Sequence, residues 1–235
     1  MEEQINKFGI FVINLDIRKE RWQNVIKIAS KHKLDVSRVK AARPGDFPEG
    51  KNKFLDPTIF AIWQSHRRAL ENLILSGAEF GLILEDDFKV NPKFDLDVLE
   101  ECRKNRFDFC QIGFLKESYW ERADITFYTI RDQILKIMSR LILPKFLGAK
   151  FLIQEQKNVP FKFIKNDIRA GAHAYFVSKN FAMSMQEINS SPTFLSADQL
   201  YMSLGEMRTF NMVRLRKSQI NQDSSPSSVI NRFKI

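Results

Sequence analysis

The chain has 235 residues, of which 44% are hydrophobic and 28% are charged, and these values are typical of a soluble globular protein with a full core. The sequence contains no apolar stretch of 18 or more residues, so we expect that the protein does not span a membrane. With 37 Lys and Arg against 28 Asp and Glu, the net charge of +9 favours an anionic partner: a nucleotide, a lipid head group or a nucleic acid.

The two cysteines and the two ends of the chain indicate compartment and domain organisation. Cys102 and Cys110 are expected on a helix and in the next strand, which favours reduced, buried thiols over a disulfide scaffold. Residues 1–4 lack the basic start and apolar centre of a signal peptide. We therefore expect a cytoplasmic protein with a single domain at residues 1–216 and a polar, loosely ordered tail at residues 217–235.

The chain opens with a predicted strand and helix. Residues 8–15 form an apolar run typical of a buried strand, and residues 22–29 carry apolar side chains at helical spacing, with Asp16 as the expected N-cap. Arg18 and Arg21 fall around the first turn of the helix, at the carboxyl end of the strand, where open α/β sheets bind ligands. These arginines either hold a nucleotide or are ordinary surface residues.

The most informative stretch is an apolar run, residues 80–84, that ends in Glu85, Asp86 and Asp87. The run is short enough for a strand buried on both faces. Three adjacent carboxylates resist burial unless water, backbone N–H groups or a cation compensates them, so they form either a Mg²⁺ or Mn²⁺ site or a solvated strand end. Because side chains alternate along a strand, Glu85 and Asp87 share a face, which favours this outer pair as metal ligands.

Two histidines and one further acid are additional candidates. His66 lies on the apolar stripe of a predicted helix that ends at Gly77, which favours a structural role over ligand contact. His173 lies among small residues and either meets a ligand or metal or is buried and bonded to the backbone. Asp198 falls in the first turn of a predicted helix capped by Ser196, where the helix dipole favours an acid, or it faces the same cleft as the other acids.

Residues 131–165 form a basic, amphipathic insertion with several phenylalanines. Such a segment either lies on an anionic membrane surface or is an ordinary helix with a solvated basic side. The large excess of basic over acidic residues favours association with a membrane surface.

Several spaced blocks occur together in the order seen in one protein family. They are Ile13-Asn14-Leu15-Asp16 with Arg18 and Arg21, Ser65-His66-Arg67-Arg68, Leu84-Glu85-Asp86-Asp87, Ala172-His173-Ala174-Tyr175 with Ser178, and Asp198. On these blocks the sequence resembles glycosyltransferase family 25, the bacterial lipooligosaccharide glycosyltransferases related to the collagen galactosyltransferases. The resemblance extends from about Phe8 to about Arg216.

This resemblance implies a fold and a reaction. The expected fold is α/β, a GT-A-like nucleotide-binding sandwich with a central mixed, mostly parallel sheet flanked by helices. The expected enzyme is a metal-dependent, inverting glycosyltransferase that moves a hexose, commonly galactose, from a UDP-sugar to a hydroxyl of a lipooligosaccharide or other glycan acceptor. The acidic motif corresponds to the family's metal-binding signature, normally with Mn²⁺, with Mg²⁺ as the alternative, and Glu85 and Asp87 are the expected ligands.

The resemblance also assigns roles to the remaining candidates. Asp198 is the expected catalytic base, or else a further metal ligand. An enzyme with a glycolipid acceptor is expected at the inner face of the cytoplasmic membrane. Two other functions stay open: a basic nucleic-acid-binding module, and a nucleotide-sugar-binding protein without turnover. The side chains expected to contact the nucleotide sugar are Asn14, Asp16, Arg18, Arg21, His66, Asp86 and His173.

Overall fold

The computed structural model describes residues 8–47, 55–92, 97–114, 159–188, 195–208 and 210–222. Most of the basic insertion predicted at residues 131–165, and most of the tail, lie outside the described residues. Within these ranges, no helix combines the length and the apolar character that crossing a bilayer requires.

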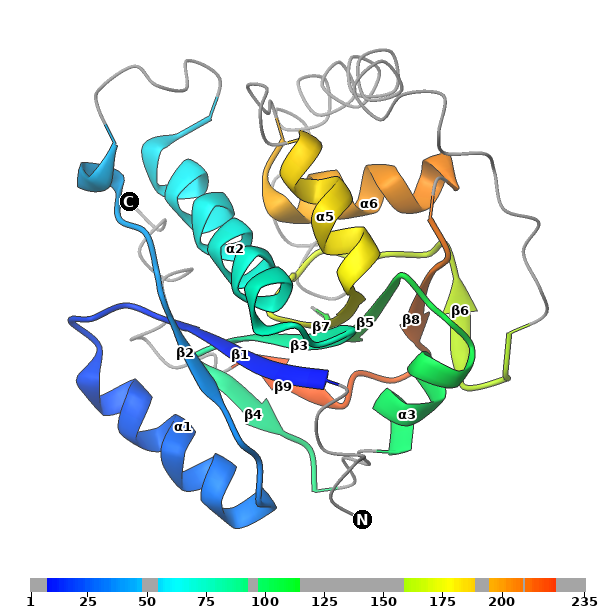
Figure 1. Ribbon diagram of the computed structural model, residues 1–235, viewed down its shortest axis with the longest axis horizontal. Helices are drawn as coiled ribbons and strands as arrows, with labels where there is room; N and C mark the ends of the chain where they lie inside the picture. The colour runs from blue at the N-terminus through cyan, green and yellow to red at the C-terminus, as the bar shows by residue number, and fades with distance from the viewer. Residues whose placement is uncertain are drawn as a thin grey trace, which may run out of the picture.

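A seven-stranded mixed sheet forms the centre of the molecule, in the order β2-β1-β3-β7-β5-β8-β6 (Figure 1). Five strands run in one direction, and β6 and β7 run against them. The prediction of an α/β protein with a mixed, mostly parallel sheet is therefore confirmed. The strands are β1 (Phe8–Asn14), β2 (Ser37–Lys40), β3 (Phe80–Glu85), β5 (Phe109–Gly113), β6 (Phe163–Lys165), β7 (Ala174–Ser178) and β8 (Met212–Leu215).

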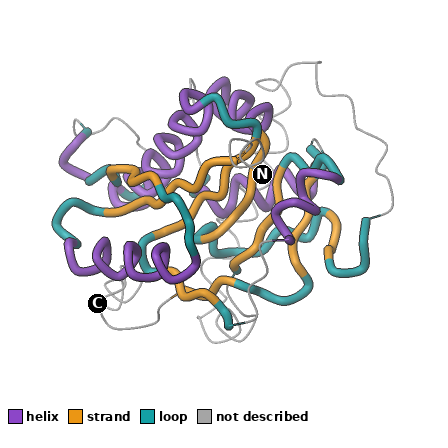
Figure 2. Tube along the Cα trace, turned by 60° about the horizontal axis from the view of Figure 1, so that its bottom comes forward, coloured by secondary structure: helices purple, strands orange, loops and turns teal. Residues whose placement is uncertain are grey.

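Helices cover both faces of this sheet (Figure 2). The core on one face takes side chains from α2, α5 and α6, and the core on the other face takes side chains from α1 and α3. Cys102 on α3 and Cys110 in β5 are free thiols buried in the second core, as predicted. The helices are α1 (Lys19–His32), α2 (Pro57–Ser76), α3 (Asp97–Lys104), α5 (Lys179–Ile188) and α6 (Ala197–Met207), with a 3-10 turn, η2, at Pro44–Asp46.

The two strands that lead to the candidate site are buried on both faces. In β1, Phe11 and Ile13 pack into one core, and Ile10 and Val12 pack into the other. In β3, Ile83 packs on the first side while its neighbours pack on the second. This is the pattern expected of short, continuous apolar runs in a central sheet.

Local signals set the ends of the helices. Ser196 accepts a hydrogen bond from the Gln199 N–H and caps α6 as predicted, and α2 ends before Gly77, which has a φ of 77°. The prediction that Asp16 caps α1 is wrong. Arg18 precedes that helix without a side-chain cap, and the Asp16 carboxylate instead pairs with side chains of the neighbouring strand β2.

A second, two-stranded sheet lies beside the end of β3. It consists of β4 (Phe88–Val90) and β9 (Ile220–Gln222), which pair in antiparallel fashion with Phe88 opposite Gln222. The expectation of a loosely ordered tail is therefore wrong for residues 220–222. The cause is long-range pairing: the Gln219 N–H also donates to the carbonyl of Ile112 at the end of β5 (3.1 Å), which fixes the start of β9.

Candidate active site

The three acids lie at the carboxyl ends of the adjacent, parallel strands β1 and β3. Glu85 ends β3 opposite Ile13 of β1, and Asp86 and Asp87 form the turn into β4. Asp86 and Asp87 are each only 8% exposed. Because buried carboxylates need compensation, their partners determine what the site can do chemically.

Asp86 is fully paired by residues of β1 and α1. Asn14 donates from Nδ2 to Oδ2 of Asp86 (2.6 Å), and Arg21 donates from Nη1 to Oδ1 (2.9 Å). The side-chain carbonyl of Asn14 in turn accepts from Nε of Arg38 on β2 (2.8 Å). Asn14, which is 1% exposed, is therefore held between a guanidinium and a carboxylate, and it fixes the turn that carries the acids.

Asp87 is only partly paired. Its Oδ2 lies 3.4 Å from Nη1 of Arg21 and 3.3 Å from Nε2 of Gln222, both long for hydrogen bonds. Its Oδ1 is buried and has no hydrogen-bond partner among the described residues. Burial and the nearby charge of Glu85 raise the pKa of Asp87 to about 7. Asp87 is thus a buried acid with one oxygen available to a cation or a proton.

Glu85 lies between Gln222 and His66. Its Oε2 is 3.4 Å from Nε2 of Gln222, and its Oε1 is 3.4 Å from Nε2 of His66. Burial acts to raise the pKa of Glu85, but the hydrogen bond from His66 and the charges of His66, His173 and Arg21 together outweigh burial, so the net pKa is lowered. Glu85 therefore stays ionised beside Asp87.

His66 is the end of a buried chain of polar groups. Its ring is 1% exposed, and its Nδ1 lies 2.9 Å from the hydroxyl of Tyr175, which lies 3.3 Å from the hydroxyl of Tyr201. Burial raises the pKa of Tyr175 well above its ordinary value, so this phenol keeps its proton and can either donate to Nδ1 of His66 or accept from it. The two tyrosine hydroxyls therefore fix the orientation of the buried His66 ring, whose Nε2 faces Glu85.

Asp198 and His173 lie on the other side of the same strand end. Asp198 accepts from the N–H groups of Gly171 (3.0 Å) and Ala172 (2.7 Å). Burial raises the pKa of Asp198, and the charge of Glu85 adds to the increase. The carbonyl of His173 accepts from the Glu85 N–H (2.9 Å), so the loop that holds Asp198 is bonded directly to the acidic strand.

The His173 ring itself faces the backbone. It is 1% exposed, and its Nε2 lies 3.3 Å from the carbonyl oxygen of Ile220 in β9. Gly113 makes room for it, since a Cβ at that position would be 2.7 Å from Nε2. The contact with Ile220 fits the structural alternative, but Nδ1 of His173 is buried without a hydrogen-bond partner among the described residues, so its contact with a ligand or metal stays a prediction.

Asp16 and Arg18 lie where β1 leaves the sheet. Asp16 pairs with Nζ of Lys40 (3.1 Å) and with Arg38 (3.4 Å), and the hydrogen bond from Lys40 lowers the pKa of Asp16. Arg18 lies 3.8 Å from the carboxylate of Glu20, and its Nε is buried with no hydrogen-bond partner in the described part of the chain. These two side chains border the cluster without sharing its hydrogen bonds to Asp86.

The sequence did not single out three residues that shape the site. Arg38 fixes Asn14, but an arginine in a short, largely exposed strand carries no signal of such a contact. Tyr175 lies within a block used for the family resemblance, although its bond to His66 joins residues 109 positions apart. Gln222 lies in a polar, serine-rich segment, and only the pairing of β9 with β4 brings it to the acids.

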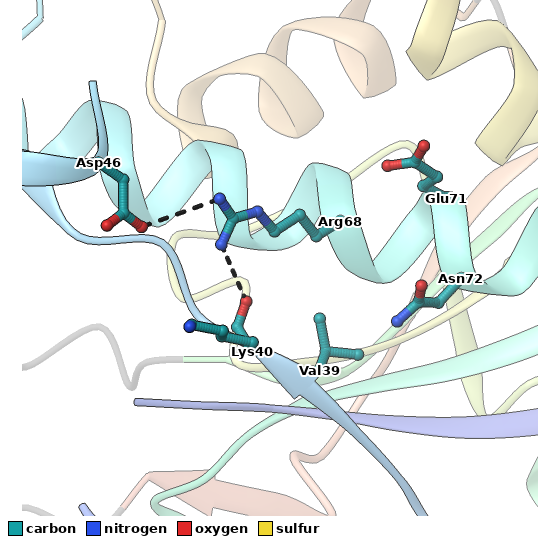
Figure 3. Close-up of a pocket in the computed structure, with 6 residues that line it drawn as sticks. All are labelled: Val39, Lys40, Asp46, Arg68, Glu71 and Asn72. Atoms are coloured by element: carbon teal, nitrogen blue, oxygen red, sulfur yellow. Dashed lines mark hydrogen bonds and ion pairs between the residues drawn. The ribbon is translucent and has the colours of Figure 1, made fainter. Parts of the chain in front are cut away.

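An open cavity of about 510 Å³ lies beside α2 and β2 and is separate from the acidic cluster. Figure 3 shows Arg68 reaching from α2 toward Asp46 and the carbonyl of Lys40, at 3.8 and 3.3 Å. None of the predicted site residues lines this cavity. It is lined by Val39, Lys40, Asp46, Arg68, Glu71 and Asn72.

Comparisons with known proteins identify the family of the chain. The model of glycosyltransferase family 25 (LPS biosynthesis protein) matches residues 8–201. No curated protein matches the sequence. Among solved structures, S. aureus TarS 1–349 in complex with UDP matches 94% of this chain and 61% of its own, with 12% identity and a TM-score of 0.43. Another S. aureus TarS structure matches 94% and 37%, with 13% identity and a TM-score of 0.41.

The chain spans less than two thirds of the TarS chains that it matches. The family match, by contrast, spans most of this chain and includes Asn14, Arg21, Glu85, Asp87 and Asp198. The chain therefore belongs to glycosyltransferase family 25.

Proposed function

We propose that the protein transfers a hexose, with galactose as the first candidate, from a UDP-sugar to a hydroxyl of a lipooligosaccharide or another glycan acceptor. The supporting observation is the cluster at the carboxyl ends of β1 and β3 in a chain of family 25, where Oδ1 of Asp87 is buried and has no hydrogen-bond partner among the described residues. A nucleotide diphosphate and its cation meet the requirements of such a cluster, because they bring both positive charge and further oxygen ligands.

Glu85 and Asp87 are the proposed holders of Mn²⁺ or Mg²⁺. Among the described residues, no three His, Cys, Asp or Glu side chains lie together as a metal site. Two carboxylates nevertheless fit a hard cation that takes its other ligands from substrate phosphates and water. Burial and the charge of Glu85 raise the pKa of Asp87 to about 7, and a cation at this position would lower it again by stabilising the ionised carboxylate. When bound, the cation offsets the charge of the departing diphosphate.

The basic residues around the acids have different proposed roles. Arg21 is bound to both Asp86 and Asp87, so together with Asn14 it keeps the acidic turn rigid. Arg18, with 17% of its side chain exposed and its Nε buried, is the proposed contact of the nucleotide phosphates, and Asp16 borders the same edge. Arginine suits this role because its planar fork matches phosphate oxygens.

Asp198 is the proposed catalytic base. The acceptor hydroxyl attacks the anomeric carbon from the face opposite the diphosphate, which inverts the configuration, and Asp198 takes the hydroxyl proton. Two backbone N–H groups fix the orientation of Asp198, while burial raises the pKa of its carboxyl and makes the carboxylate a better proton acceptor.

A transfer assay with UDP-sugars, lipooligosaccharide acceptors and Mn²⁺ tests this function. We expect a product whose new linkage has the inverted anomeric configuration by NMR. Asp87→Asn and Asp198→Asn should each lower the transfer rate by about 100-fold or more, the effect expected for loss of a general base or a metal ligand. Unchanged transfer in Asp87→Asn would remove this acid from the mechanism.

We also propose that the enzyme works at the inner face of the cytoplasmic membrane, where its basic insertion meets anionic lipids. The support is the net charge of +9 and the basic composition of residues 131–165. Co-sedimentation with anionic vesicles that weakens with salt, and no co-sedimentation with neutral vesicles, is the expected result. Equal binding to both kinds of vesicle would contradict it.

A further inference from the structure

We propose that Gln222 supplies a third protein oxygen to the divalent cation, by turning its side-chain carbonyl toward Glu85 and Asp87. This inference rests on the proposed function, in which these two carboxylates hold the cation. It adds a residue from the far end of the chain, outside the region matched by the family model.

The Gln222 amide already occupies a position between the two carboxylates. Its Nε2 lies 3.4 Å from Oε2 of Glu85 and 3.3 Å from Oδ2 of Asp87. A single donor that reaches both acids marks the region where a positive charge between them is most strongly stabilised. Both distances exceed the usual 2.9 to 3.0 Å of an N–H to O bond, so these two hydrogen bonds are weak and oppose a turn of the amide only slightly.

The side-chain amide of Gln222 can face the acids with either its nitrogen or its oxygen. Nitrogen and oxygen occupy equivalent ends of the glutamine side chain, and a half-turn of its terminal torsion exchanges them. With the nitrogen toward the acids, Gln222 donates hydrogen to the carboxylates. With the oxygen toward them, it faces a bound cation, and glutamine carbonyls are ordinary ligands for hard divalent ions.

The proposed protein donors at the site are two carboxylates, and Gln222 would add a third. In the described ranges, carboxylate, imidazole and thiolate groups do not form a set of three, so Glu85 and Asp87 are two ligands without a third of those types. Asp87 is 8% exposed, and its Oδ1 lacks a hydrogen-bond partner in the same ranges. Gln222 is the amide in contact with both ligands, and its carbonyl supplies the third oxygen.

The register of the small sheet directs Gln222 to this position. Phe88, the first residue of β4, follows Asp87 directly and pairs with Gln222. The preceding residue, Asn221, pairs with Lys89 and is exposed. Since successive strand residues point to opposite faces, Asn221 offers a matched control on the same strand.

The test is Mn²⁺ binding to the full chain, measured by the EPR signal of free Mn²⁺ in the presence of UDP. We expect Gln222→Ala to raise the Kd for Mn²⁺ by about 10-fold or more, the scale seen when a metal site loses a supporting group. Asn221→Ala should leave this Kd unchanged. Gln222→Glu, which retains an oxygen donor and adds charge, should bind Mn²⁺ at least as tightly as the wild type. Thermal unfolding in EDTA verifies that each variant is folded.

Three results would overturn the proposal, and they differ in whether they also overturn the proposed function. If the wild type binds Mn²⁺ and Gln222→Ala binds it equally well, the role of Gln222 is wrong and the proposed function stands. The same holds if Gln222→Glu loses Mn²⁺ affinity as Gln222→Ala does. If the wild type binds no Mn²⁺ in the presence of UDP, the cation site of the proposed function fails together with the role of Gln222.

Discussion

At the scale of single residues, the site consists of acids that differ in how well they are compensated. Asp86 is satisfied by Asn14 and Arg21, whereas Asp87 has a buried oxygen without a partner in the described structure. The spacing of the motif separated Asp86 from the outer pair by strand alternation alone. In the structure β3 ends at Glu85 and Asp86 and Asp87 form a turn, so strand alternation does not apply to them. Asp86 differs from Asp87 because Asn14 and Arg21 pair both of its oxygens.

The raised pKa of Asp87 gives the folded protein a defined pH dependence in EDTA. The folded state holds the proton of Asp87 more tightly than the unfolded state does. The resulting contribution to the free energy of unfolding is fully present below the ordinary pKa of 3.8 and is lost as pH rises through about 7. The free energy of unfolding from urea titrations should fall over this window. Asp108 and Asp198, whose pKa values are also raised, contribute in the same direction. The difference between wild type and Asp87→Asn therefore isolates Asp87, and parallel pH curves for the two proteins would contradict the assignment.

The buried chain of hydroxyl groups behind His66 should contribute measurably to stability. Tyr175→Phe removes the hydroxyl that lies 2.9 Å from Nδ1 of His66 and leaves the buried ring unsatisfied. We expect the free energy of unfolding to fall by about 2 kcal/mol. Tyr201→Phe, which removes only the 3.3 Å contact with Tyr175, is the matched control and should cost less. Equal losses in the two variants would show that His66 does not depend on Tyr175.

At the scale of elements, strands and helices with strong local signals were predicted and an element formed by long-range pairing was not. β1 and β3 were expected because short apolar runs bury both faces, and α6 because Ser196 is a good cap. β9 was missed because Asn221 and Gln222 are polar and the strand that it pairs with, β4, is three residues long. Pairing across more than a hundred residues leaves no periodic signal in the sequence.

The packing of β9 against the end of β5 depends on a glycine. A Cβ at Gly113 would lie 2.6 Å from the carbonyl oxygen of Ile220 and 2.7 Å from Nε2 of His173, closer than side-chain carbons approach other atoms. Gly113→Ala should therefore displace β9, lower the free energy of unfolding by about 1–3 kcal/mol and weaken Mn²⁺ binding through Gln222.

Gly45→Ala is the control for this substitution, because a Cβ at Gly45 would have no atom within 4 Å. Urea unfolding should place this variant within about 0.5 kcal/mol of the wild type. Should Gly113→Ala match Gly45→Ala in stability and in Mn²⁺ affinity, β9 would not be held as described.

At the scale of the whole molecule, the sheet brings together residues that the sequence could place only at the same edge. The predicted strand ends were sufficient to place Asn14 and Asp86 near each other, since parallel strands end together. Their direct hydrogen bond, across 72 residues, could not be read from the sequence because it depends on side-chain geometry. It shows that Asn14 holds an acid, while its contact with the nucleotide sugar stays a prediction.

The most direct test of the central claim is a thermal-shift screen of UDP-sugars on the full chain, with Mn²⁺ and with EDTA. A ligand at 100 times its Kd stabilises the folded state by about 2.7 kcal/mol, which is readily seen as a rise in Tm. We expect one UDP-sugar to raise Tm in Mn²⁺, with little rise in EDTA or in Asp87→Asn. Failure of every UDP-sugar to stabilise the protein, together with salt-sensitive binding of oligonucleotides, would contradict a nucleotide-sugar site and favour a nucleic-acid-binding module.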